Sequence, residues 1–176
     1  ATNGGPTRIL VTHTHKDHSP AAALLAARCN AELIGLPPPL DPNHDQSFQP
    51  LLQPADDELL GTGPEQLRAV HTPGHASNHV CWLHTDSGLL FTGEHVRQGG
   101  TVVIPPPDGD MAAYLASLQK IAQLAMQAIA PGHGALMEDT DRAIRRLVRH
   151  RLQREARVVD RLRTLGRATL DDLLPL

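Results

Sequence analysis

The sequence predicts a single α/β domain, and its length, apolar content and segment pattern indicate this class. The chain has 176 residues, of which 40% are hydrophobic, so it can bury a core of ordinary size. Short apolar runs of strand length are interspersed with longer segments of helical periodicity. Turn signals rich in Pro, Gly, Asp and Ser separate these segments.

The first expected elements are a strand at residues 8–12, a helix at 21–29 and a strand at 31–36. The helix start is marked by Ser19 followed by Pro20, because serine is a preferred N-cap and proline is preformed for the first helical position. Residues 37–64 are rich in Pro, Asp and Gln, which predicts a loop with one short hairpin. Loops of this kind often wall a functional site.

The second half is expected to contain a strand meander and two helices. Strands are predicted at 67–71, 79–84 and 88–92, with a turn at 85–88 that joins the last two. An alanine-rich helix is predicted at 110–126 and a long amphipathic helix at 139–165. We therefore divide the chain into a catalytic domain, 1–138, and a C-terminal region, 139–176. The apolar side of the long helix comprises Ile144, Leu147, Val148, Leu152, Val159 and Leu162.

Three histidines and one aspartate follow the first strand directly, in the hexapeptide His13-Thr14-His15-Lys16-Asp17-His18. Side chains of an extended chain alternate between two faces, so His13 and His15 can point the same way. The turn that follows directs Asp17 and His18 to another side. One short loop can therefore supply ligands to two metal ions.

Further metal-ligand candidates follow other apolar runs. His75 and His133 each stand in a Pro-Gly-His turn, which holds a histidine rigidly at a strand end. Glu94 follows the run at 88–92 after a glycine. Neutral imidazole and carboxylate are ligands that zinc prefers, and they also suit iron and manganese.

These motifs resemble, in type and order, those of the metallo-beta-lactamase superfamily of metal-dependent hydrolases. The resemblance implies an αββα sandwich and a centre of two divalent metal ions, with zinc favoured and iron or manganese as alternatives. It implies that a metal-bound hydroxide attacks an ester, thioester or related bond. It assigns His13, His15 and His75 to one ion, Asp17, His18 and His133 to the second, and Glu94 to the bridging position.

Glu94 departs from the superfamily pattern, which normally has aspartate there. Glutamate is longer by one methylene, and a bridging carboxylate has to reach both ions at about 2.0 to 2.2 Å for zinc. One hypothesis is that the second site is weakened or loosened. The alternative is that the loop adapts to the longer side chain.

Two catalytic candidates accompany the ligands. Asp17 is a ligand first, and it can also orient a water or receive its proton. His79 resembles a recurrent histidine of hydrolases of the glyoxalase II kind, where it would support the metal ligands or face the substrate; alternatively, it only opens a strand. His95 is ambiguous, and His44, His71, His84 and His150 fit no ligand pattern and are expected to be ordinary.

Residues 93–118 resemble the beta-lactamase-like protein 2 group, which includes animal endoribonucleases and many bacterial hydrolases. The segment from His150 resembles that group's long helix, which leads into a small winged-helix-like cap. In the family, a layer of strands precedes the first metal-binding loop. We therefore expect a sandwich that is incomplete at its N-terminus, a cap that is only begun, and an exposed apolar sheet surface that favours association.

Charge is distributed unevenly, since residues 1–138 carry a net charge of −7 and residues 139–176 a net charge of +4. Arg142, Arg145, Arg146 and Arg149 have the spacing of one helix face and can follow a phosphate backbone. The alternative is an ordinary solvated face. Single-strand binders stack bases on aromatic rings, and only 2% of this chain is aromatic, so RNA is the second choice of partner.

The sequence therefore favours a metal-dependent hydrolase acting on a small-molecule substrate. The alternatives are a single-strand endoribonuclease, a mononuclear iron persulfide dioxygenase and a non-catalytic metal-binding fragment. Cys29 and Cys81 form no CxxC motif, which indicates a reducing compartment and favours the cytoplasm. No apolar run is long enough to span a bilayer, so no membrane partner is expected.

Overall fold

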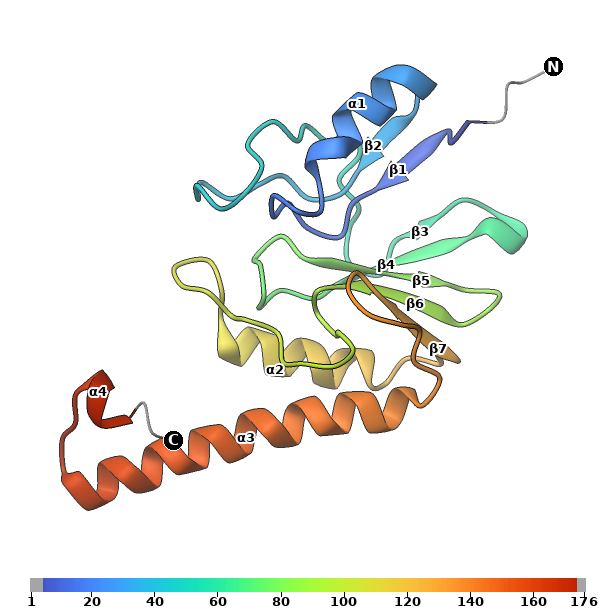
Figure 1. Cartoon of the computed structure of the whole chain (residues 1–176). Helices are drawn as coiled ribbons and strands as arrows, with labels where there is room; N and C mark the ends of the chain where they lie inside the picture. The colour runs from blue at the N-terminus through green and yellow to red at the C-terminus, as the bar shows by residue number, and fades with distance from the viewer. Residues whose placement is uncertain (1–4, 174–176) are drawn as a thin grey trace.

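The structure is a computed structural model that describes residues 5–173, and within them two β-sheets lie between helices (Figure 1). Helix α1 (Pro20–Cys29) covers the smaller sheet. Helices α2 (Met111–Ile121) and α3 (Thr140–Leu165) lie on the far side of the larger sheet. The order of layers is helix, sheet, sheet, helix, which confirms the expected αββα class.

The smaller sheet pairs β1 (Arg8–Leu10) with β2 (Glu32–Ile34) in parallel, with α1 as the crossover between them. Both strands are shorter than expected because the chain leaves the sheet early. Val11 still bonds to Ile34, but the carbonyl of Thr12 accepts a hydrogen bond from the amide of Val80 in the other sheet, at 2.7 Å. The segment before His13 therefore joins the two sheets.

The larger sheet has the strand order β3 (Leu59–Leu60), β4 (Leu67–His71), β5 (Val80–His84), β6 (Leu89–Gly93) and β7 (Ala128–Pro131). The pairs from β3 to β6 are antiparallel, which confirms the meander. Strand β7 returns parallel to β6 after α2. Residues 37–64 are mainly loop, with β3 and the short 3-10 turn η1 (Gly63–Glu65) near their end.

The larger sheet has an apolar core on each face, because successive side chains of a strand point to opposite sides. Cys81 and Leu83 of β5 belong to the core that includes residues of α2 and α3. Val80 and Trp82 belong to the core that contains Ile34 of the smaller sheet. Both sheets are thereby held at a fixed spacing, which positions the loops at their ends.

Helix α3 packs against the larger sheet only along its first half. Ile144 and Leu147 are buried in the same core as the larger sheet. Leu152, Val159 and Leu162 are exposed, however, so the sheets cover the expected apolar side only in the first half, and the second half extends away from them (Figure 1). The predicted boundary between the catalytic domain, 1–138, and the C-terminal region, 139–176, stays a prediction. The start of α3 packs against the catalytic domain.

The remaining expectations concern the C-terminal end and the cysteines. Helix α4 (Leu170–Leu173) follows α3, residues 174–176 lie outside the described part, and the winged-helix-like cap stays a prediction. Helix α2 ends at Ile121, five residues earlier than the sequence pattern indicates. Cys81 is buried, whereas Cys29 is partly exposed. None of the helices in residues 5–173 is long and apolar enough to cross a membrane.

Candidate metal centre

The predicted ligands lie in four loops that meet at one end of the two sheets. These loops follow β1, β4, β6 and β7. In Figure 1 they lie at the left ends of the strands, next to the start of α1 and of α2. Segments more than a hundred residues apart, such as Asp17 and His133, thereby come into contact.

One ligand group consists of His13, His15, His75 and Glu94, whose ligand atoms all lie within 4.8 Å of one another. His15 Nδ1 is 2.9 Å from His75 Nε2, and His75 Nε2 is 3.0 Å from Glu94 Oε2. His13 and His75 are almost completely buried. This group therefore forms the enclosed side of the centre.

The other group consists of Asp17, His18, Glu94 and His133, again within 4.8 Å. Asp17 Oδ2 is 3.2 Å from His133 Nε2 and 3.4 Å from His18 Nε2. The side chains of Asp17 and His133 are 59% and 40% exposed, so this group forms the open side. Glu94 belongs to both groups, as expected for a bridging residue.

The donor set fits divalent metal ions. Nε2 of His13 and Nε2 of His18 are buried and have no hydrogen-bond partner in the described part of the chain, a costly state that metal coordination would relieve. Burial, followed by the neighbouring His75, lowers the pKa of His15 to about 4, so its ring is neutral near pH 7. The hydrogen bond with His75 lowers the pKa of Glu94 to about 2, so its carboxylate is ionised. Neutral imidazole and ionised carboxylate are the ligating forms.

Two glycines allow the loops to approach this closely. A Cβ atom on Gly93, whose φ is +49°, would lie 2.5 Å from Thr12 Oγ1. A Cβ atom on Gly132 would lie 2.9 Å from Cε1 of His18. The glycines before Glu94 and His133 therefore make room for the loop after β1, and that loop carries four of the predicted ligands.

The orientation of His75 is set by the chain behind it. His75 Nδ1 lies 2.7 Å from the carbonyl oxygen of Val103. A carbonyl can only accept, so Nδ1 carries the proton and donates it. A divalent ion bound in this group would take the place of the hydrogen bond between Nε2 and Oε2 of Glu94, and Nε2 would hold it through its lone pair.

His79 lies behind the ligands and does not face solvent. Its side chain is completely buried, and its ring centroid is 5.0 Å from that of His13. His79 Nδ1 is 2.8 Å from Thr72 Oγ1. The expectation that His79 faces substrate is therefore wrong in this structure, whereas a supporting position next to a ligand agrees with it.

His44 is a residue that sequence reasoning missed. It is buried, its ring centroid lies 4.4 Å from that of His15, and its Nδ1 is 2.7 Å from Thr14 Oγ1. Its Nε2 is 3.3 Å from Oδ2 of Asp108. His44 belongs to neither ligand group, in agreement with the expectation that it fits no ligand pattern, but it links the 37–64 loop to the ligand loop. The only available signal was that this loop was expected to wall a site.

Arg97 was also missed. Its Nη1 is 3.6 Å from Glu94 Oε1, and its Nε is buried with no partner among residues 5–173. His95 lies between Glu94 and Arg97 in the sequence and is completely buried. Its burial lowers its pKa to about 3. Neither ring nitrogen of His95 has a partner in the described residues.

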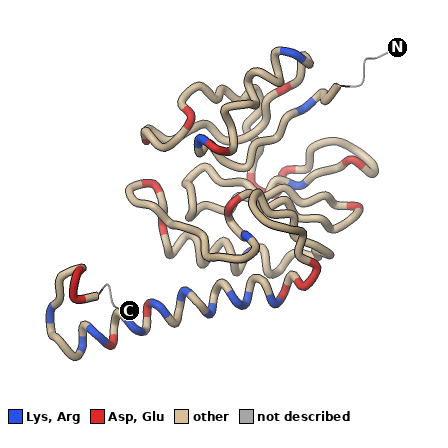
Figure 2. The backbone as a smooth tube through the Cα atoms, viewed as in Figure 1, with Lys and Arg blue, Asp and Glu red and all other residues tan. Residues whose placement is uncertain are grey.

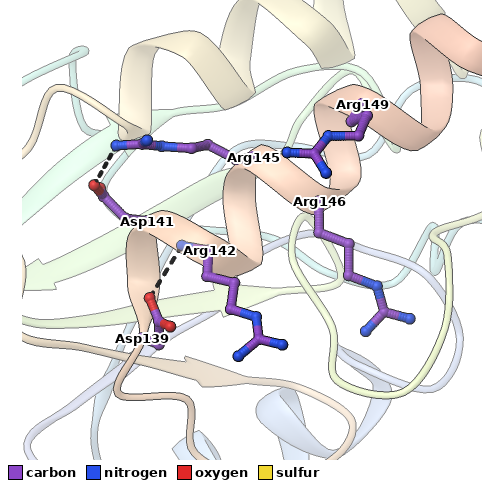
Figure 3. A pocket seen from close by; sticks show the side chains of 6 residues that line it. All are labelled: Asp139, Asp141, Arg142, Arg145, Arg146 and Arg149. Atoms are coloured by element: carbon purple, nitrogen blue, oxygen red, sulfur yellow. Dashed lines mark hydrogen bonds and ion pairs between the residues drawn. The ribbon is translucent and has the colours of Figure 1, made fainter.

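The four arginines of the predicted stripe line one exposed pocket of about 510 Å³ on the first half of α3 (Figure 3). Arg145 is paired with Asp141 at 2.6 Å, and Asp139 accepts a hydrogen bond from the backbone of Arg142. The side chains of Arg142, Arg146 and Arg149 form no ion pair with the described residues. Figure 2 shows further basic residues along the rest of α3.

Comparisons with known proteins agree on one family. The model of the Metallo-beta-lactamase superfamily matches residues 2–133. The atrochrysone carboxyl ACP thioesterase of Aspergillus fumigatus is 31% identical over 159 residues, which cover 90% of this chain and 48% of that protein. A beta-lactamase-like protein 2 homolog of Drosophila melanogaster is 34% identical over 161 residues, which cover 86% of this chain and 52% of that protein.

A solved structure shows the same fold. The crystal structure of a metallo-beta-lactamase family protein from Thermus thermophilus superposes with a TM-score of 0.75 at 20% identity, over 88% of this chain and 64% of that one. The chain thus spans about half the length of the two curated relatives.

Proposed function

Since this chain belongs to the metallo-beta-lactamase superfamily, we propose that it is the metal-binding part of a hydrolase that cleaves a thioester or a related acyl bond. The observation that carries the proposal is the pair of ligand groups that share Glu94. The name of the relative from Aspergillus fumigatus supports a thioester as the bond that is cleaved.

In this proposal His13, His15 and His75 hold one divalent ion, and Asp17, His18 and His133 hold the other. Glu94 serves both. Ions bound in such a centre supply Lewis-acid activation of water and of the substrate carbonyl. Zinc is proposed first because the donors are imidazole and carboxylate, and iron or manganese are the alternatives.

The difference in burial between the groups suggests where the substrate enters. His13 and His75 are buried, whereas the side chain of Asp17 is mostly exposed and that of His133 is partly exposed. We therefore place the approach of the acyl carbon on the side of Asp17. We assign to the Asp17 carboxylate oxygen that does not hold the ion the task of orienting the attacking water and taking its proton. No serine or cysteine nucleophile is needed.

The test is hydrolysis of an acyl thioester by the zinc-loaded protein, followed by trapping of the released thiol. Asp17→Asn keeps the size of the side chain but removes its basicity, so we expect the rate to fall about a hundredfold or more. His84→Gln, at the end of β5 away from the metal ligands, is the matched control and should retain the wild-type rate. A zinc-loaded wild type that releases no thiol would rule out the proposal.

The same assay distinguishes the alternatives. A lactam, a phosphodiester and RNA are offered in parallel, and an iron-loaded sample is offered a persulfide under oxygen. Cleavage of RNA alone would favour the nuclease, and oxygen consumption with persulfide would favour the dioxygenase. Metal binding without any turnover would leave a binding function.

RNA is retained as the second candidate substrate because Arg142, Arg146 and Arg149 present unpaired positive charge on one helix face (Figure 3). Figure 1 shows that α3 starts at the end of the sheets opposite the histidine loops, so a bound strand would have to run along the molecule to reach them. The logarithm of the RNA-binding constant should fall linearly with the logarithm of the salt concentration. Replacing these three arginines by glutamine should make this slope shallower by the equivalent of about three phosphate contacts. An unchanged slope would exclude RNA binding by these arginines.

A further inference from the structure

Arg97 places a positive charge directly beside the carboxylate that the two ligand groups share. Its Nη1 is 3.6 Å from Glu94 Oε1, and its side chain is only 35% exposed. A guanidinium carries a fixed charge and five donors. The shared carboxylate is therefore already engaged by a cation that belongs to the chain itself.

The two oxygens of Glu94 have different surroundings. Oε2 lies 3.0 Å from Nε2 of His75, in the enclosed group. Oε1 lies 3.7 Å from Nε2 of His133, in the open group, and it is also the oxygen next to Arg97. The guanidinium thus stands on the side of the carboxylate that a second ion would use.

The backbone around Arg97 is anchored, so this contact is built into the loop. Val96 is completely buried, and its carbonyl accepts a hydrogen bond of 2.8 Å from the hydroxyl of Thr92. Gln98 Oε1 accepts a hydrogen bond of 2.9 Å from the amide of Ala135, in the loop that carries His133. Arg97 is held between these two attachments.

The open group is already the weaker of the two on structural grounds. The side chain of Asp17 is 59% exposed and that of His133 is 40% exposed, so ordering them on a metal ion costs more conformational entropy than for the buried His13 and His75. A neighbouring positive charge adds electrostatic repulsion of the incoming ion. Both effects act on the same group.

We propose that Arg97 is a positioning residue that holds Glu94 Oε1 and weakens binding of the second divalent ion, so that the enclosed site fills first. This inference rests on the proposed two-ion centre. It follows that occupancy of the open site, and any activity that needs it, depends on the metal concentration, whereas the enclosed site stays filled.

The test is a zinc titration of the metal-stripped protein in competition with a chromophoric chelator, which gives a dissociation constant for each step. Arg97→Met removes the charge and keeps an unbranched side chain. We expect the second step to tighten about tenfold or more, with the first step unchanged within about twofold. Arg97→Lys keeps a positive charge and should stay close to the wild type.

Arg145→Met is the matched control, because it removes an arginine that is paired with Asp141 on α3. It should leave both steps unchanged. If Arg97→Met does not fold, as judged by its thermal transition, Arg97→Gln replaces it as an uncharged variant. A wild type that binds one ion, together with an Arg97→Met protein that binds two, also supports the inference.

The inference is overturned if the second step is unchanged or weaker in the uncharged variant, or if both steps shift equally. A wild type and variant that both bind no second ion would contradict the two-ion centre and the inference together. A third outcome would contradict the proposed reaction alone. In that case the second zinc-binding step tightens in Arg97→Met as expected, but the zinc-loaded protein releases no thiol from a thioester.

Discussion

The buried histidines differ in what their second ring nitrogen contacts, and this difference separates their tasks. His75 donates to the carbonyl of Val103, and His79 and His44 lie within hydrogen-bond distance of Thr72 and Thr14. These partners set the orientation of rings in or beside the ligand groups. His95 has no such partner in residues 5–173. Its ring centroid lies 4.8 Å from that of Tyr114, with the two rings tilted by 57°, and the hydroxyl of Tyr114 donates to the carbonyl of His95.

His95 should make the metal-free protein sensitive to acid. Burial lowers its pKa to about 3, whereas an unfolded histidine titrates near 6.5. Between these values only the unfolded state binds the proton, so stability is complete above pH 6.5 and is lost as the pH falls toward 3. Between pH 7 and pH 5, His95 alone should lower the free energy of unfolding by about 2 kcal/mol.

The variant His95→Phe keeps an aromatic ring against Tyr114 and removes the titration. Between pH 7 and pH 5, we expect the free energy of unfolding to fall by about 2 kcal/mol less in this variant than in the wild type. Urea unfolding with a chelator present measures both drops. Equal losses in the two proteins would show that His95 does not titrate on unfolding.

At the scale of elements, α3 combines two helices of different character in one continuous segment. Its first half contributes Ile144 and Leu147 to the core, whereas its second half exposes Leu152 and Val159. The join between the halves is Arg151, whose guanidinium lies over the ring of Tyr114 and donates to the carbonyl of Val102. The helix is therefore attached to the loop that orients His75.

Leucine truncations should reveal this division. Leu147→Ala removes a side chain that is 6% exposed and leaves a cavity, so we expect a loss of about 2 to 5 kcal/mol in the free energy of unfolding. Leu152→Ala is the matched control on the same helix and is 50% exposed, so we expect a loss below about 1 kcal/mol. Urea unfolding measures both. Similar losses would mean that the second half of α3 is also packed.

At the scale of the molecule, the candidate metal centre joins the two sheets. The loop after β1 continues from the smaller sheet, and the loops after β4 and β6 continue from the larger one. His13 and His15 come from the former, and His75 and Glu94 from the latter. An ion bound by this group would therefore link the layers as well as prepare a reaction.

Removal of metal should destabilise the whole fold. An ion present at about a thousand times its dissociation constant stabilises the folded state by about 4 kcal/mol. For a chain of this size we expect the melting temperature to fall by about 10 °C with chelator and to recover with zinc. His75→Ala should melt at the same temperature with and without zinc at low concentration. A wild type whose melting temperature ignores the chelator would refute metal binding at this site.

Most elements could be predicted from the sequence because their signals are local. Period-two and helical patterns identified β4 to β6, α1 and α3 to within one residue at each end, and α2 apart from its early C-terminal end. The prediction fails where distant contacts decide. Ser19 begins α1 as expected, but its side chain donates to Asp45 and makes no cap bond. The second half of α3 has an amphipathic pattern, yet no layer among the described residues covers it.

The sequence by itself determined the family and the candidate ligands, because the spacing within the hexapeptide from His13 to His18 and the Pro-Gly-His turns is a local property of the chain. Only the tertiary structure decided which side of the centre is enclosed, that His79 is buried behind His13, and that His44 and Arg97 adjoin the ligands. The physical reason is that burial and contact depend on segments that are distant in sequence and meet only when both sheets are packed.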